Sequence, residues 1–146
     1  MKSWLMAVCL FLFVGVSAHA DELDADGKRA YATLKSVSLF ATYGVGRAGV
    51  KSDGEKALRI LLKQKQAEAA LQSLLQEANL TGQMYALVGL KSVNPTIFEK
   101  AVTPFLTLKT RVKTAHGCLV SSEIVEKIVE DIRKGNYPLR PERKQK

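Results

Sequence analysis

The apolar residues of this chain recur mostly at three- and four-residue steps, which is the spacing of one face of an α-helix. Tyr31, Leu34, Val37 and Ala41 show this pattern first. We therefore expect a helix over residues 28–43, although the stretch that starts at Val37 could also open a strand.

A second helix is predicted from a capping box. In Ser52-Asp53-Gly54-Glu55 the serine oxygen can accept from a free amide of the first turn while the glutamate reaches back. Apolar residues then follow at helical spacing as far as Ala78, with a polar seam at residues 64–66. The segment 58–78 is either one long helix or two helices with a bend at that seam.

The middle of the chain holds the most apolar segment. Residues 79–82 carry a turn signal, and the run from Met84 to Leu90 is apolar nearly all round, which predicts a deeply buried helix. Asn94-Pro95 then supplies a helix cap with proline in the first turn. The helix that follows is expected to kink near Pro104.

The last helix is expected to begin at Ser121 or Ser122 and to end at Gly135, with an apolar stripe from Ile124 to Ile132. No segment alternates convincingly enough to predict a strand. The pattern thus predicts an all-α protein of five to six amphipathic helices. Two architectures stay open, a helical bundle and a short HEAT-like helical-repeat stack.

The first twenty residues have the pattern of a secretory signal peptide. Lys2 is followed by an apolar run from Trp4 to Val16 and by the small-residue site Ala18-His19-Ala20. The run is shorter than the roughly 20 residues that span a bilayer as a helix. We therefore expect a signal peptide over 1–20, one helical domain over 21–135 and a basic tail over 136–146. The protein is then periplasmic or secreted, with no transmembrane segment in the mature chain.

The positive charge of the chain limits the classes of partner that we expect. The chain has 22 Lys and Arg against 14 Asp and Glu, a formal net charge of +8, and only Lys2 of these bases lies in the leader. The segment 133–146 alone holds six of the bases and one acid. Nucleic acid is an uncommon partner outside the cytoplasm. The charge therefore indicates an acidic protein partner or an anionic envelope surface.

Cysteine content limits how the fold is stabilised. Cys9 lies in the leader, so Cys118 is the single thiol of the expected mature chain and no intramolecular disulfide can form. Free cysteines are among the most buried residues, and we expect Cys118 to be buried.

Gly44, Gly46 and Gly49 match the spacing of a dinucleotide-binding loop. That loop should follow a strand in a parallel sheet, whereas here it follows a helical pattern. We interpret it as a flexible or closely packed turn between helices and expect no cofactor.

The segment 109–118 is the most suggestive for function. If it is extended, Lys109, Arg111 and Lys113 project from one side and form a compact positive edge; if it is helical, they spread over the surface. His116 and Cys118 lack an orienting third group for thiol catalysis and are too few for a structural zinc site. No catalytic or metal site is expected.

One resemblance bears on location. The run Gly82-Gln83-Met84-Tyr85-Ala86-Leu87-Val88-Gly89-Leu90, followed by Val112 and by Gly117-Cys118, resembles a pattern of small exported bacterial helical proteins of unassigned function. The resemblance covers Gly82 to Gly135. It implies export and a helical fold, and it carries over no site residues.

These observations predict an exported, non-catalytic binding protein that presents a basic surface to an acidic protein partner, for example an immunity-type inhibitor of a toxin. An envelope-associated structural protein that binds anionic surfaces and an unrecognised hydrolase are the alternatives. The candidate contact residues are Lys109, Arg111, Lys113, Arg140, Arg143 and Lys144.

Overall fold

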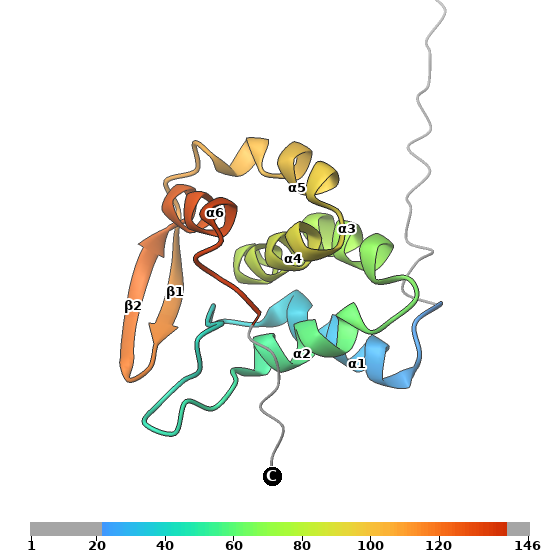
Figure 1. Ribbon diagram of the computed structural model, residues 1–146, viewed down its shortest axis with the longest axis horizontal. Helices are drawn as coiled ribbons and strands as arrows, with labels where there is room; N and C mark the ends of the chain where they lie inside the picture. The colour runs from blue at the N-terminus through green and yellow to red at the C-terminus, as the bar shows by residue number, and fades with distance from the viewer. Residues whose placement is uncertain (1–21, 140–146) are drawn as a thin grey trace, which may run out of the picture.

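A computed structural model describes residues 22–139 of the chain (Figure 1). In this part the chain forms six α-helices, one short 3₁₀ helix and one β-hairpin. The elements are α1 (Ala25–Ser36), α2 (Asp53–Leu62), α3 (Ala67–Glu77), α4 (Leu80–Val93), α5 (Pro95–Ala101), η2 (Thr103–Phe105), β1 (Arg111–His116), β2 (Leu119–Ile124) and α6 (Val125–Lys134).

The helical prediction is confirmed in its coarse form, but the chain is not all-α. Residues 119–124 pair with β1 instead of starting the last helix, so α6 begins at Val125 and neither Ser121 nor Ser122 caps it. The Ser121 hydroxyl instead meets the Thr114 hydroxyl across the strands at 2.9 Å. Strand pairing therefore overrides the local capping signal.

Helix α4 lies at the centre of the fold. It packs against each of the other five α-helices and against β1. Met84, Tyr85, Leu87 and Leu90 are fully buried, as the apolar run predicts. In a helical-repeat stack each repeat contacts only its neighbours, whereas here one central helix contacts all the other α-helices.

Side-chain caps define most helix starts. Asp24, Ser52, Asn79 and Asn94 each accept a hydrogen bond from the backbone amide three residues further on. Such caps satisfy amides that have no partner within the helix. The polar residues 64–66 lie between two separate helices, because α2 ends at Leu62 and α3 begins at Ala67.

The ends of two helices are also fixed by specific contacts. Helix α6 ends at Lys134 and is capped by Gly135, whose φ of +84° suits glycine. The Lys91 ammonium of α4 donates to the Arg133 carbonyl at 2.6 Å and to the Ile132 carbonyl, so a cation occupies the C-terminus of α6. Helix α1 ends at Ser36, short of the predicted Tyr43.

The residues after α1 are extended because β1 and Tyr85 bind their backbone. The Phe40 amide donates to the Lys113 carbonyl at 2.9 Å, and the Ala115 amide donates to the Phe40 carbonyl at 3.2 Å. On the other side the Tyr85 hydroxyl accepts from the Ala41 amide at 2.9 Å. Phe40 therefore pairs with β1 as a one-residue third strand.

Tyr85 also joins this segment to α2. Its hydroxyl lies 3.0 Å from the Leu39 carbonyl and 2.9 Å from the Ser52 hydroxyl, which caps α2 and donates to the Ala41 carbonyl at 2.7 Å. Burial is the main reason that the pKa of Tyr85 is raised above its ordinary value. The phenol is therefore neutral at physiological pH.

We predict that Tyr85→Phe and Ser52→Ala each lower the free energy of unfolding by about 1–3 kcal/mol, because each leaves buried polar groups unpaired. The two losses should be coupled by at least about 0.5 kcal/mol in a double-mutant cycle measured by chemical denaturation. Ser36→Ala, at an exposed helix end, is the control and should change stability by less than about 0.5 kcal/mol. Strict additivity of the two core substitutions would contradict this account.

A second prediction concerns Gly82 of α4. A Cβ at this position would overlap the Leu34 backbone carbonyl and lie 2.8 Å from the Ala78 Cβ, which cannot move aside easily. Gly82→Ala should therefore destabilise the protein by about 1–3 kcal/mol in spite of the higher helix propensity of alanine.

Gly27→Ala in α1 is the matched control for this substitution. Its Cβ would meet the flexible end of the Gln64 side chain, with the nearest atom at 2.7 Å. The Gln64 amide can move aside at the cost of its two exposed hydrogen bonds with Asp24, so we expect a smaller loss than for Gly82→Ala, within about 1 kcal/mol. Equal thermal midpoints for the two variants would show that the contact with Leu34 does not constrain α4.

Candidate partner-binding surface

The hairpin consists of two six-residue strands separated by a two-residue turn that begins with glycine. β1 and β2 pair antiparallel from Arg111 opposite Ile124 to His116 opposite Leu119. Gly117 has a φ of +59°, and Cys118 does not have a positive φ. A positive φ at the first central residue and a negative φ at the second are typical of a type II′ turn, whose twist matches that of a hairpin.

The two faces of the hairpin differ in chemistry. Residues opposite each other in an antiparallel pair point to the same face. One face carries the buried Val112 and Thr114 and packs on the protein. The other face carries the exposed Arg111, Lys113 and Ser122, and we call it the basic face; its members are Arg111, Lys113, Ala115, Val120, Ser122 and Ile124, of which Ala115 is buried and Ile124 is half-buried.

The predicted basic contact residues differ in their location and in their ion pairs. Arg111 and Lys113 lie together on the basic face, as the extended alternative requires. Lys109 precedes the strand and forms an ion pair with Glu126 of α6, so its charge is compensated. Arg140, Arg143 and Lys144 lie outside the described residues. The positive edge therefore consists of two residues instead of three.

No acidic residue shares the basic face. The one acid of the hairpin, Glu123, points to the opposite face, where its carboxylate lies 3.9 Å from His116 Nε2. The Arg111 guanidinium reaches across to donate to the Ser122 carbonyl of β2. Lys113 makes no ion pair within residues 22–139. This face can therefore attract an anionic group.

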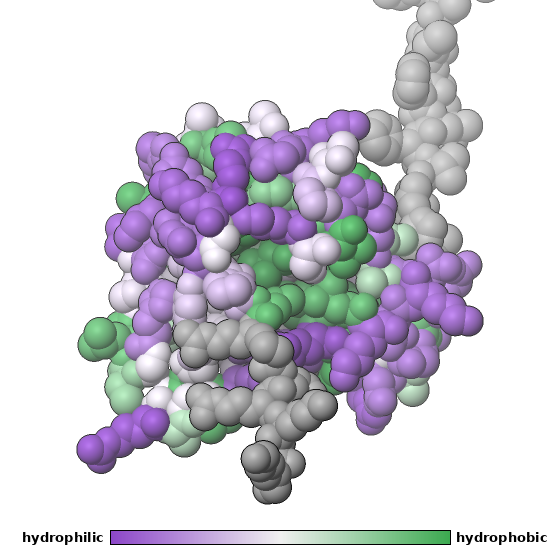
Figure 2. All heavy atoms as spheres, in the orientation of Figure 1, coloured by the Kyte–Doolittle hydropathy of each residue, from purple (hydrophilic) through white to green (hydrophobic). Residues whose placement is uncertain are grey.

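The tip of the hairpin is apolar and accessible. The exposed fractions of Leu119 and Val120 are 76% and 57%, the highest among the large hydrophobic residues that the structure describes. Figure 2 shows hydrophobic residues at the left edge of the molecule, where Figure 1 places the hairpin. Cys118 is exposed in the turn, so the prediction that it is buried was wrong. Cys118 lies at the tip of the hairpin beside the exposed Leu119 and Val120, away from the core.

His116 belongs to an aromatic cluster and not to a thiol–imidazole pair. Its ring lies 5.3 Å from that of Tyr43 and 6.2 Å from that of Tyr137, measured between centroids. Burial first, and then the charge of Glu123, raises the pKa of Tyr137 above its ordinary value. No hydrogen bond joins His116 to Cys118 in the described part of the chain. This cluster fastens the hairpin to the segment after α6.

The glycine-rich segment lies beside the hairpin. Gly44, Gly46 and Gly49 all have positive φ values, and the loop between them closes through hydrogen bonds between Val45 and Val50. Gly46 donates to the Gly117 carbonyl at 2.8 Å. Gly44 approaches the Gly49 backbone closely, whereas Gly46 and Gly49 have open space around them and residues 47–50 are exposed. The segment is therefore a turn that is closely packed only near Gly44, and it does not open a helix in the manner of a dinucleotide site.

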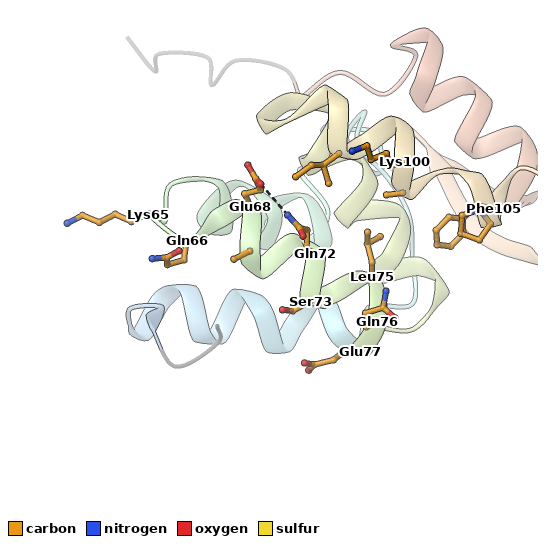
Figure 3. Close-up of a pocket in the computed structure, with 14 residues that line it drawn as sticks. Lys65, Gln66, Glu68, Gln72, Ser73, Leu75, Gln76, Glu77, Lys100 and Phe105 are labelled. Carbon is orange, nitrogen blue, oxygen red and sulfur yellow. Dashed lines mark hydrogen bonds between the residues drawn. The ribbon is translucent and has the colours of Figure 1, made fainter. Parts of the chain in front are cut away.

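A groove on another face runs between α3 and the α5–η2 segment and has a volume of about 1060 Å³ (Figure 3). Its apolar lining includes Leu75 and Phe105. Bases and acids both border it, including Lys100 and Glu68, and the Glu68 carboxylate accepts from Gln72 at 3.2 Å. Because both signs are present, the groove offers no net charge to select a partner.

Comparison with known proteins gives no relative. No protein-family model, no curated protein and no solved structure matches the chain. Within residues 22–139 no helix is both long and apolar enough to cross a membrane. The same residues contain no group of three or more His, Cys, Asp or Glu side chains placed to hold a metal ion.

Sequence reasoning missed the second strand and its exposed edge. The signal was present, because two runs with strand-forming residues flank the dipeptide Gly117-Cys118. Helical spacing of the apolar residues from Ile124 to Ile132 concealed it, because Ile124 fits the helical stripe although it is the last residue of β2. Leu119, Val120 and Ser122 are therefore surface residues that only the structure assigns to the candidate site.

Exposure of Cys118 leads to a direct prediction. In the native protein this thiol should react with a chromogenic disulfide reagent at a rate within about tenfold of that in denaturant, because nothing shields it. The reaction is followed by absorbance, and circular dichroism of the labelled protein confirms that the fold persists. A native rate slower by several orders of magnitude would show that the hairpin tip is covered.

Proposed function

We propose that this chain is an exported, non-catalytic binding protein that uses the basic face of its hairpin to bind an acidic protein partner. One observation carries the proposal: Arg111 and Lys113 are both exposed on one strand face, and that face holds no acidic side chain. A charged patch of one sign favours a partner of the opposite sign and steers its approach. The apolar residues of the tip adjoin these charges.

The neighbouring apolar tip favours a protein partner over a charged lipid or polymer surface. Protein interfaces combine buried apolar contacts with a polar rim. Leu119 and Val120 could supply such contacts beside the charges of Arg111 and Lys113. An inhibitor that masks the active site of a delivered toxin is one form that such a protein could take.

The arrangement of His116 supports a binding role over a catalytic one. A nucleophile needs a base within hydrogen-bond reach and a group that orients the base. His116 faces Glu123 and is flanked by Tyr43 and Tyr137, while the Cys118 thiol lies in the turn. The hairpin residues thus serve to hold a surface in place.

The test is a charge reversal on the basic face. Arg111→Glu combined with Lys113→Glu should weaken capture of the partner from a cell-envelope extract by tenfold or more, and capture by the unaltered protein should fall as salt rises. Lys28→Glu combined with Lys63→Glu changes the net charge equally on exposed positions of α1 and the α2 terminus. This control should leave capture unchanged.

Sedimentation with vesicles of anionic lipid tests the alternative that the protein binds an anionic envelope surface instead of a protein. If the unaltered protein sediments with such vesicles and the hairpin variant does not, the partner is a surface and the proposal is wrong. The proposal would also be contradicted if neither salt concentration nor the two hairpin substitutions changed the amount of partner captured. Thermal unfolding of each variant shows that the fold is intact.

A further inference from the structure

β1 lies inside a three-stranded arrangement, and β2 forms its outer edge. On one side β1 pairs with β2. On its other side β1 bonds to the segment after α1: Phe40 pairs with Lys113 and Ala115, and Gly44 and Gly46 pair with Gly117. Figure 1 shows β2 at the outside of the molecule with no other element beyond it.

The register identifies which backbone groups of β2 are free. Peptide groups alternate in direction along a strand. Since those of Lys113 and Ala115 face Phe40, those of Val112, Thr114 and His116 face β2. Their partners Glu123, Ser121 and Leu119 therefore point inward. The amide and carbonyl of Val120 and the amide of Ser122 point outward.

These outward groups have no hydrogen-bond partner within residues 22–139. The Ser122 carbonyl is the exception, because the Arg111 guanidinium occupies it. A row of free amides and carbonyls on an exposed strand is a template for one more strand. The position of Arg111 also places a positive charge at the outer edge of β2, next to the space that an added strand would fill.

We propose that the edge of β2 binds an extended acidic segment of the partner as an added strand. The proposal rests on the binding function proposed above and specifies its mode. Main-chain hydrogen bonds to Val120 and Ser122 supply affinity, as in other cases of strand addition. Arg111 and Lys113 select acidic side chains on the face that they share with Val120 and Ser122.

Charge argues against a second copy of this chain as the occupant. Two β2 edges paired antiparallel about a twofold axis perpendicular to the sheet would continue one sheet, with equivalent faces on the same side. The two β1 strands would then be separated by both β2 strands, but the Arg111 guanidinium of each copy reaches the outer edge of β2. Both guanidinium groups would lie along the junction between the copies with no acidic residue on the basic face, which opposes self-association and favours an acidic strand.

The first measurement is amide hydrogen exchange of the full chain with a synthetic peptide that alternates Glu with Val and Thr. In the free protein the Val120 and Ser122 amides should exchange faster than the inward amides of Ser121 and Glu123. Binding at a peptide concentration up to about 1 mM should protect Val120 and Ser122. Unchanged exchange at both amides would overturn the proposal.

The second measurement compares peptide variants and needs no change to the protein. N-methyl groups on the peptide amides that face β2 should weaken binding at least tenfold, whereas N-methyl groups on the amides that face away should not. Equal affinity for both peptides, together with loss of binding in the charge-reversal variant, would refute strand addition and leave the basic surface as the binding site.

Ser122→Pro tests the edge from the protein side. Proline is tolerated where a strand amide faces solvent, so the hairpin should persist, while the outward amide is removed and the pyrrolidine ring blocks an added strand. We expect at least tenfold weaker peptide binding, with Ser122→Ala as the unaffected control. If the unaltered protein sediments as a dimer that Ser122→Pro converts to monomer, a second copy occupies the edge and the proposal is wrong.

Discussion

The hydrogen bonds of one buried phenol hold three parts of this protein together. The Tyr85 hydroxyl projects from the central helix α4 and binds the backbone at Leu39 and Ala41 and the capping serine of α2. Each of these groups is polar and would be costly to bury without a partner. The core can therefore close around α4 only when the chain after α1 is extended and Ser52 caps α2.

This constraint decides where the candidate site lies. Because Tyr85 holds residues 39–41 in place, Phe40 can bond to β1 from the side opposite β2. β1 thus becomes an interior strand, and β2 is left as the edge. The aromatic contacts of His116 with Tyr43 and Tyr137 then fasten the far end of β1. A rigid base supports a surface whose outer strand is open, which reduces the ordering cost of binding.

The basic face combines two effects of the same charges. The Arg111 guanidinium extends from β1 to the outer edge of β2, and a positive charge at an exposed strand edge discourages pairing between copies, which is a common protection against aggregation. The same charge attracts an acidic segment, so protection against self-association and selection of a partner do not conflict. The groove between α3 and α5 is large, but positive and negative side chains both line it. It therefore lacks the preference for an acidic partner that the basic face has.

The sequence by itself determined the features that depend on neighbouring residues. Ser52 and Asn94 begin helices because their side chains satisfy nearby amides, and the apolar run around Tyr85 is buried because no face of that helix is polar. At the candidate site, sequence predicted that Arg111 and Lys113 would share one side if extended, but it could not choose between strand and helix.

Only the tertiary structure made that choice, because strand formation depends on hydrogen-bond partners far away in the chain. Phe40 supplies them for β1, and β1 supplies them for residues 119–124, which therefore do not join α6. The exposure of Cys118 and the free edge of β2 follow from the same pairing. Local periodicity contains no information about these contacts, whereas the closed core does.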